Sequence, residues 1–196
     1  MKPIDIAGFE EKYRQAIDPW NYRTSRFEAR KRAELLRACG LGKVGRGLEL
    51  ACAIGETSRA LVSRCLTLVA SDGAPTALAE ARRLTPPGMR IAYREGNLPH
   101  EMPRGPFDLI VVSEIAYYLS PRDLDLLARR IRNETAPGGR VVVLHHTVPF
   151  PDAAQLPALA QARLARCLER GMSPAGQRSF GRYEIAVFRK PSRRDR

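Results

Sequence analysis

The sequence predicts an α/β fold, in which a doubly wound, mostly parallel sheet of seven strands has helices on both faces and a helical cap before its first strand. Short apolar runs, typical of buried strands, alternate along the chain with segments whose apolar residues recur at helical spacing. This alternation favours a parallel sheet, because each strand is followed by a helix that packs on one face. In addition, small and acidic residues follow the first two strands, at the edge where such sheets bind ligands.

The segment before the first strand is predicted to be a cap of two helices. Residues 9–17 have the pattern of a short amphipathic helix, and Asp18-Pro19 ends it. A second helix is expected over residues 25–39, with Thr24 or Ser25 as its N-cap. Because both helices precede the first strand, they can pack only around the rim of the sheet, where they would cover a cleft.

The rest of the chain continues the alternation of strands and helices. Strands are predicted at residues 47–50, 66–72, 89–94, 107–113 and 140–144, and a closing hairpin at residues 177–180 and 182–188. Helices are predicted after Gly55, with apolar positions at Ala60, Leu61, Val62 and Cys65, and at residues 75–84, 123–133 and 155–170. Pro137-Gly138-Gly139 predicts a turn before the fifth strand.

A run of small residues follows the first strand and predicts a ligand site. Ala51, Ala53 and Gly55 stand two residues apart behind Glu49, where the strand gives way to a helix. Side chains no larger than a methyl group let the backbone come close to a ligand, and a helix N-terminus offers free N–H groups to a carboxylate or phosphate. The spacing differs from the G-x-G-x-x-G of dinucleotide-binding loops. The alternative is a tight turn that binds nothing.

The second strand ends on Asp72, and this position decides between the two interpretations of the loop. A carboxylate at the tip of the second strand can accept hydrogen bonds from both hydroxyls of a ribose. The loop and Asp72 together therefore favour a nucleoside-containing ligand over a structural turn.

Length and composition indicate one globular domain. The chain has 196 residues, of which 44% are hydrophobic and 28% charged. We expect a single domain over residues 1–190, with a cap at 1–45, a ligand-binding core at 46–150, an acceptor-side helix and hairpin at 151–190, and a disordered basic tail at 191–196. No segment has the roughly 20 apolar residues of a membrane span, and the N-terminus has no apolar run, so we expect a cytoplasmic protein without a membrane partner.

The net charge of +12 is unevenly placed. Residues 47–162 carry 12 basic and 12 acidic residues, whereas residues 12–46 and 163–196 each carry 10 basic against 3 acidic residues. Such flanks could hold an anionic acceptor or nucleic acid. We favour arginines on solvated helix faces, because no RNA-binding signature accompanies the charge. We therefore do not expect nucleic acid to be a partner.

These motifs resemble those of S-adenosylmethionine-dependent methyltransferases, and the chain is similar along nearly its whole length to the nodulation protein S type. The segments that carry the resemblance are Asp18-Pro19-Trp20, Phe27-Glu28 with Arg30, the loop from Glu49 to Gly55, Asp72-x-x-Pro75, Phe107 to Glu114 with Tyr117-Tyr118-Leu119, and Ala136-Pro137-Gly138-Gly139. The resemblance implies the Rossmann-like class I methyltransferase fold, S-adenosylmethionine as cofactor and S-adenosylhomocysteine as product.

The resemblance also implies which residues bind the cofactor. The backbone of Ala51, Cys52, Ala53 and Gly55, behind Glu49, would face the methionyl carboxylate; Asp72 and Gly73 would face the ribose, Asn97 and Leu98 the adenine, and Ser113 the methyl-bearing end, with Trp20 and Tyr22 in the covering cap. The family usually has Asp where Asn97 stands, and glycine where two of the loop alanines stand. For the acceptor, the resemblance implies the amine of an aminosugar or deacetylated oligosaccharide.

Five residues are candidates for a general base, namely Glu114, Tyr117, Tyr118, His145 and His146. Histidine is the side chain most readily tuned to take a proton near neutral pH. The two histidines end the fifth strand, where side chains alternate, so one of them at most can face the cleft. With three histidines and four dispersed cysteines, which we expect to be buried thiols, we expect no metal site.

Two other functions stay open at this point. The acceptor could be an anionic small metabolite methylated on oxygen or nitrogen, or the protein could bind a cofactor or nucleic acid on the same fold without catalysis. The sequence does not fix the oligomeric state.

Overall fold

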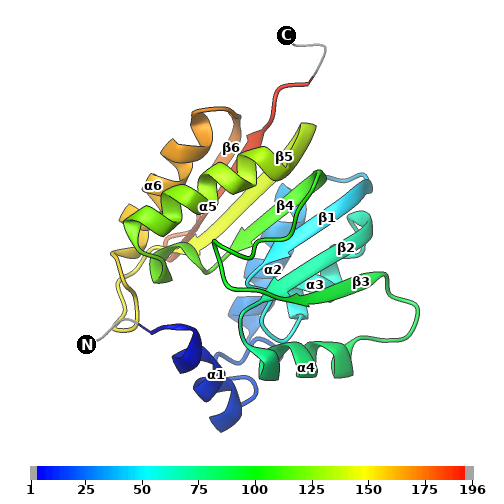
Figure 1. Cartoon of the computed structure of the whole chain (residues 1–196), viewed down its shortest axis with the longest axis vertical. Coiled ribbons are helices and arrows are strands. Elements are labelled where there is room, and N and C mark those ends of the chain that lie inside the picture. The colour runs from blue at the N-terminus through cyan, green and yellow to red at the C-terminus, as the bar shows by residue number, and fades with distance from the viewer. Residues whose placement is uncertain (1–3, 193–196) are drawn as a thin grey trace.

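One sheet of seven strands, in the order β3-β2-β1-β4-β5-β7-β6, runs through the computed structural model, which describes residues 4–192 (Figure 1). The strands are β1 (Val44–Leu50), β2 (Cys65–Asp72), β3 (Ile91–Glu95), β4 (Phe107–Ser113), β5 (Thr135–His146), β6 (Ser173–Ser179) and β7 (Tyr183–Arg189). Strands β1 to β5 pair in parallel, while β7 is antiparallel to both β5 and β6. The predicted mostly parallel sheet with a closing hairpin is confirmed.

Helices cover both faces of the sheet, as predicted for a doubly wound fold. They are α1 (Ile6–Gln15), α2 (Arg26–Ala38), α3 (Glu56–Leu61), α4 (Pro75–Leu84), α5 (Pro121–Glu134) and α6 (Pro157–Glu169), with the short 3-10 helix η1 (Ala116–Tyr118) after β4. In Figure 1, α5 and α6 lie in front of the sheet and α2 lies behind it. Among residues 4–192, no helix has both the length and the apolar character needed to cross a membrane.

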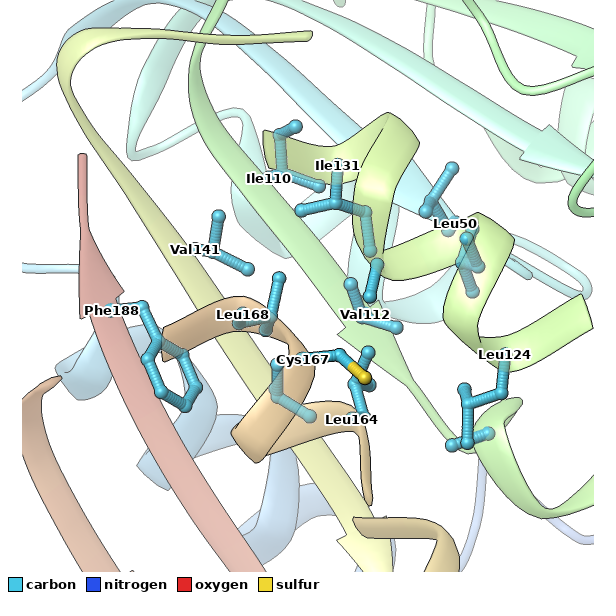
Figure 2. Packing of buried hydrophobic residues seen from close by; sticks show 14 of the residues in the cluster. Leu50, Ile110, Val112, Leu124, Ile131, Val141, Leu164, Cys167, Leu168 and Phe188 are labelled. Atoms are coloured by element: carbon cyan, nitrogen blue, oxygen red, sulfur yellow. The ribbon is translucent and has the colours of Figure 1, made fainter. Parts of the chain in front are cut away.

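The central strand β4 is buried on both sides and connects the two halves of the core. Ile110 and Val112 pack with α5 and α6, whereas Leu109 and Val111 face α2 and α3. Figure 2 shows the first of these interfaces, where side chains of α5 and α6 close over the sheet. Complete burial of an aliphatic side chain stabilises the fold by about 1.5–3 kcal/mol relative to exposure. The continuous apolar run of β4 is therefore sufficient to fix its central position.

Two predicted elements differ from the structure. The segment Pro137-Gly138-Gly139 lies inside β5, where the pairing with β4 jumps from Thr135 opposite Phe107 to Arg140 opposite Leu109. The chain does bend there, since Gly138 has a φ of 77°, but hydrogen bonds with Lys190 keep this bend in the sheet.

The helix after Gly55 is shorter than its apolar pattern predicted. It ends at Leu61, and Cys65 is the first residue of β2. The other predicted elements begin or end a few residues away from the observed positions. The end of an element is set by its hydrogen bonds and not by its apolar spacing. All four cysteines are buried free thiols, as predicted. Residues 193–196 of the predicted tail lie outside the described part of the chain.

The segment before β1 docks on the rim of the sheet in two parts. Ser25, rather than Thr24, is the N-cap of α2 and accepts a hydrogen bond from the N–H of Glu28. Polar side chains of α1 bind it to the rest of the protein. Lys12 Nζ lies 2.6 Å from Asp152 Oδ2, and the Glu10 carboxylate accepts hydrogen bonds from the N–H and the hydroxyl of Thr76 on α4. That this segment closes over a bound cofactor stays a prediction.

Tyr183 carries a buried polar atom without a partner. Its side chain is 3% exposed, its ring stacks on Phe180 at 4.7 Å, and its hydroxyl has no hydrogen-bond partner within residues 4–192. An unsatisfied buried hydroxyl costs about 1–3 kcal/mol of desolvation.

We therefore expect Tyr183→Phe to raise the free energy of unfolding by about 1 kcal/mol, because it removes that hydroxyl and keeps the ring. Urea unfolding would measure the change. Tyr93→Phe is the matched control, since the Tyr93 hydroxyl is hydrogen-bonded to Thr85 at 2.9 Å and its loss should be destabilising. Equal destabilisation by both substitutions would contradict the prediction.

Candidate functional site

A pocket of about 600 Å³ opens at the carboxyl edge of the parallel strands. This volume is typical of small-molecule and cofactor sites. Its walls come from the segment before β1 and from the ends of strands β1 to β5 with the loops that follow them: Ile4, Asp5, Ile6, Phe9, Tyr13, Trp20, Tyr22, Glu28, Lys31, Ala51, Ala53, Asp72, Gly73, Ala74, Gly96, Asn97, Leu98, Ser113, Glu114, Ile115, Tyr117, Tyr118, Leu119, His146, Phe150, Pro151 and Asp152.

The loop after β1 presents its backbone to this pocket. Ala51, Ala53 and Gly55 have φ values of 58°, 50° and 76°, so every second residue lies in the left-handed region. The loop is held in this shape by its own N–H groups, since those of Cys52, Ala53 and Gly55 donate to Ser71, Asp72 and Cys52. For alanine the conformation costs roughly 1–2 kcal/mol, which the surrounding contacts must offset.

Ala51 and Ala53 line the pocket, whereas Gly55 does not and is required for another reason. A Cβ at Gly55 would lie 2.6 Å from the hydroxyl oxygen of Tyr93. The structure therefore gives Gly55 a packing role beneath the loop, and its predicted part in cofactor binding stays a prediction. Cys52 is likewise buried under the loop at 4% exposure.

Asp72 joins the loop to the end of β2. Its Oδ2 accepts a hydrogen bond from the N–H of Ala53 at 2.8 Å, and its Oδ1 accepts one from Ala74 at 2.9 Å. Burial raises the pKa of this carboxyl group, while the backbone N–H groups oppose the rise. The carboxylate lines the pocket and keeps further lone pairs, and its predicted contact with ribose hydroxyls stays a prediction.

The residues predicted beside Asp72 and after β3 also line the pocket. A Cβ on Gly73 would lie 3.1 Å from Asn97 Oδ1 and 3.4 Å from the side chain of Ile6, so the absence of a side chain keeps this wall open. Asn97 and Leu98 form the adjacent wall, and Ser113 lies at the end of β4. The structure thus brings together the strand-end residues that the sequence placed in one site.

Glu49 lies beneath the loop and lines a smaller cavity that shares Ala51 and Ala53 with the main pocket, so its part in cofactor binding stays a prediction. It is 2% exposed, and the Ser58 hydroxyl donates to its carboxyl group. Burial raises the pKa of Glu49 to about 8, against the effect of the Ser58 hydrogen bond. Its position links β1 to α3 and supports the loop from behind.

A buried ionic network forms the wall opposite Asp72. Glu114 follows β4 in the left-handed region with a φ of 56°, and its carboxylate accepts from Lys31 Nζ at 2.7 Å, from the Tyr117 hydroxyl and from the N–H of His146 at 2.9 Å. Lys31 also lies 2.8 Å from Glu28. Burial alone would raise the pKa of Glu114, but Lys31 and these hydrogen bonds lower it below its ordinary value.

Lys31 is a site residue that the sequence analysis missed. It is 8% exposed and, despite burial, its pKa is raised by Glu114 and Glu28. The available signal was helical spacing, because Phe27, Lys31 and Leu35 lie four residues apart on one face of α2. A lysine on the inner face of a cap helix should have suggested a buried carboxylate partner.

The two histidines at the end of β5 separate as the alternation predicted. His146 lines the pocket, and burial together with Arg182 and Lys31 lowers its pKa against the effect of Glu114, so the imidazole is neutral near pH 7. His145 is fully buried on the other side of the strand.

His145 is therefore corrected from a candidate base to a structural residue. The N–H of Ala116 donates to its Nε2 at 3.0 Å, which places the ring proton on Nδ1, 2.7 Å from Gln161 Oε1. Burial lowers the pKa of His145, so this neutral tautomer connects β5, η1 and α6.

Aromatic rings form most of the remaining pocket wall. Phe9 meets Tyr118 edge-on at 4.8 Å, and Trp20 packs against Tyr22 at 5.8 Å and Tyr13 at 5.6 Å. Trp20 and Tyr22 therefore contact the core of the cap and line the pocket at the same time. The sequence analysis did not single out Phe9, Tyr13 or Phe150, which join the cluster from outside the sheet.

The charges on the pocket wall are predominantly negative. Five acidic residues line it, namely Asp5, Glu28, Asp72, Glu114 and Asp152. Among the described residues, Lys31 is the single lysine or arginine on this wall. Burial raises the pKa values of Tyr117 and Tyr118, with a further contribution from Glu114, so both phenols are neutral. An aromatic, acid-lined pocket favours a cationic ligand over an anionic one.

The strand order, the small-residue loop after β1 and the acidic residue at the end of β2 define the class I methyltransferase fold. The crystal structure of the N-methyltransferase NodS from Bradyrhizobium japonicum WM9, in complex with S-adenosyl-L-homocysteine, has this fold with a TM-score of 0.82 and 23% identity, and the match covers 96% of this chain and 100% of that chain. The predicted fold class is thereby confirmed.

Within that class, the model of the Nodulation protein S (NodS) family matches residues 5–136, and the chain belongs to this family. Nodulation protein S of Rhizobium tropici is 30% identical over 129 residues, which are 65% of this chain and 54% of that protein. Nodulation protein S of Bradyrhizobium diazoefficiens is 34% identical over 117 residues, 59% of this chain and 55% of that protein. The chain thus spans about half the length of these curated relatives.

The buried carboxyl group of Glu49 makes stability depend on pH. In the folded protein its pKa is about 8, above the ordinary value of 4.5, so its contribution is complete below pH 4.5 and is lost as the pH rises through about 8. We expect Glu49→Gln, which cannot ionise, to lose less stability between about pH 5 and about pH 9 than the unaltered protein, by about 1 kcal/mol or more.

Urea unfolding across this pH range would measure the difference. Glu80→Gln is the control, because Glu80 is also buried but pairs with the exposed Arg83, and its pKa is lowered. A Glu49→Gln variant with the pH dependence of the unaltered protein would rule out a protonated Glu49.

Proposed function

We propose that this protein is an S-adenosylmethionine-dependent methyltransferase that methylates an amine, with an aminosugar or short oligosaccharide as the first candidate acceptor. The observation that carries the proposal is the pocket wall, in which carboxylates and aromatic rings surround a neutral histidine. Membership in the Nodulation protein S family supports it, as does the N-methyltransferase described for the Bradyrhizobium japonicum relative.

The residues present fit the cofactor. Asp72 is a ribose acceptor at the end of β2, the left-handed loop at Ala51 and Ala53 brings backbone close to the pocket, and Gly73 leaves the adjacent wall open. Asn97 and Leu98 would flank the adenine. When bound, the cofactor supplies a methyl group on a positively charged sulfur. The acidic and aromatic wall favours that charge.

The same wall favours an amine as acceptor. A protonated amine is attracted by the five carboxylates, and no arginine is among the described residues that line the pocket. An acceptor whose reacting end is anionic would instead face Glu114 and Asp152. The amine is therefore our first choice over the anionic metabolite that the basic flanks had left open.

His146 is the residue we assign as general base. Glu114 is a poor base because its carboxylate is already held by Lys31, Tyr117 and the N–H of His146, and its pKa is low. Tyr117 and Tyr118 keep their protons because their pKa values are raised. The neutral imidazole of His146 can take the proton that an ammonium must lose before its nitrogen has a lone pair to donate.

The direct test combines cofactor binding with methyl transfer. Calorimetry should show binding of S-adenosylhomocysteine that is lost or strongly weakened in Asp72→Ala, since each charge-assisted hydrogen bond contributes about 1.5–3 kcal/mol. Transfer from labelled cofactor to deacetylated chitooligosaccharides should occur and should rise with pH through the amine pKa. Binding without transfer to any amine would favour a non-catalytic protein, and transfer only to hydroxyl compounds would refute the amine assignment.

Replacement of His146 tests the base. We expect His146→Gln to lower kcat by about 10²-fold or more, the usual range for loss of a general base, and to remove the part of the fall in rate at acidic pH that follows the His146 pKa, while the dependence on the amine pKa stays. That fall should occur below the ordinary histidine pKa of 6.5, because the pKa of His146 is lowered. His100→Gln is the control, since His100 lies on an exposed loop. An unchanged acidic limb in His146→Gln would exclude this role.

A further inference from the structure

We propose that the acceptor carries an anionic group, a carboxylate, sulfate or phosphate, which binds to an arginine surface formed by Arg30, Arg178 and Arg182 beside the pocket. The proposal rests on the proposed function for the amine end of this acceptor. It assigns the opposite end of the same molecule to residues outside the pocket wall, on α2 and on the hairpin of β6 and β7.

The two basic flanks of the sequence meet on one face of the molecule. Helix α2 packs against β7, so its exposed arginines lie beside those of the hairpin, although the two segments are about 150 residues apart in sequence. The exposed arginines of α2 and of the hairpin are Arg26, Arg30, Arg37, Arg178, Arg182 and Arg189. The intervening acids are partly buried, and Glu34 pairs with Arg178 at 3.2 Å.

This arginine surface adjoins the pocket wall. The ring of Phe27 contacts both the pocket lysine Lys31, at 5.6 Å, and the guanidinium group of Arg182, at 5.2 Å. The carbonyl of Arg182 accepts a hydrogen bond from the N–H of Thr147, the residue after His146. Arg182 also contributes to the lowered pKa of the His146 side chain.

Aromatic rings hold two of the arginines in place. The guanidinium of Arg178 lies 4.9 Å from the ring of Phe180, and Phe180 stacks on Tyr183, which meets Phe27 edge-on at 5.7 Å. The row of three rings therefore ends in Arg178 at one side and Arg182 at the other. A guanidinium fixed on a ring loses little conformational entropy when it binds an anion, and its planar donors suit oxyanions.

The guanidinium groups of Arg30, Arg178 and Arg182 keep N–H donors that can bind an anion. Within residues 4–192, Arg30 and Arg182 form no ion pair, and the Arg178 side chain is 67% exposed despite its contact with Glu34. The charge therefore changes sign from the acidic pocket wall to the adjacent surface. A molecule with an amine at one end and an anionic group further along would be oriented by both regions, amine inward.

Two tetrasaccharides separate the contributions of amine and anion. N-desulfated heparin tetrasaccharide has free amines beside carboxylates and sulfates, whereas fully deacetylated chitotetraose has amines and no anionic group. Calorimetry at about 0.15 M salt, with S-adenosylhomocysteine present, should show at least about tenfold tighter binding of the heparin fragment. This preference should be lost in Arg178→Gln/Arg182→Gln while the affinity for S-adenosylhomocysteine is unchanged.

Arg122→Gln/Arg129→Gln is the matched control, because it removes the same charge from α5 on the opposite face and should keep the preference. Equal affinity for the two tetrasaccharides, or equal loss of the preference in both double variants, would overturn the proposal even if methyl transfer to chitotetraose occurs. Tighter binding of a single-stranded DNA oligonucleotide, with the same dependence on Arg178 and Arg182, would assign the surface to nucleic acid instead. If no amine is methylated but the preference and its loss are observed, the anion surface stands without the proposed reaction.

Discussion

The carboxylate of Glu114 fixes the geometry of the pocket. It is the common acceptor for the ammonium of Lys31 on α2, the hydroxyl of Tyr117 on η1 and the backbone N–H of His146 at the end of β5. Burying a carboxylate without partners costs several kcal/mol, so these elements must assemble around it together. One charged side chain thus positions this pocket wall, His146 and helix α2 relative to the central strand.

Most of the fold could be predicted from the sequence because its elements are long or strongly patterned. The uninterrupted apolar run of β4 requires burial on both faces, and the helices at 75–84 and 121–134 show clear spacing. The segment 137–139 was the exception. Its proline and glycines correctly indicate a bend, but only the pairing of β5 with β7 shows that the bend lies within a strand.

The site residues at the ends of the strands were predictable, and those further from the sheet were not. Asp72, Ser113 and Glu114 end parallel strands, and such ends always meet at one edge, so their proximity followed from the fold. Lys31 and Asp152 come from a helix and a loop whose docking depends on tertiary contacts that no local pattern records. The alternation along β5 showed that His145 and His146 point to opposite faces of the sheet. Which of the two points away from the pocket depends on the contact of His145 with Gln161, sixteen residues further along the chain.

The ion pair between Lys31 and Glu114 also makes local opening of α2 cost more free energy than local opening of α1. Withdrawing α2 would remove the Lys31 ammonium and leave the carboxylate of Glu114 without its cationic partner, at a cost of about 3–5 kcal/mol. Helix α1 is held by contacts such as Lys12 with Asp152, whose side chains are each 38% exposed, and a pair of that kind contributes about 1 kcal/mol or less. In the hierarchy of local unfolding, the amides of α1 should thus exchange with solvent long before those of α2, which opens together with the sheet.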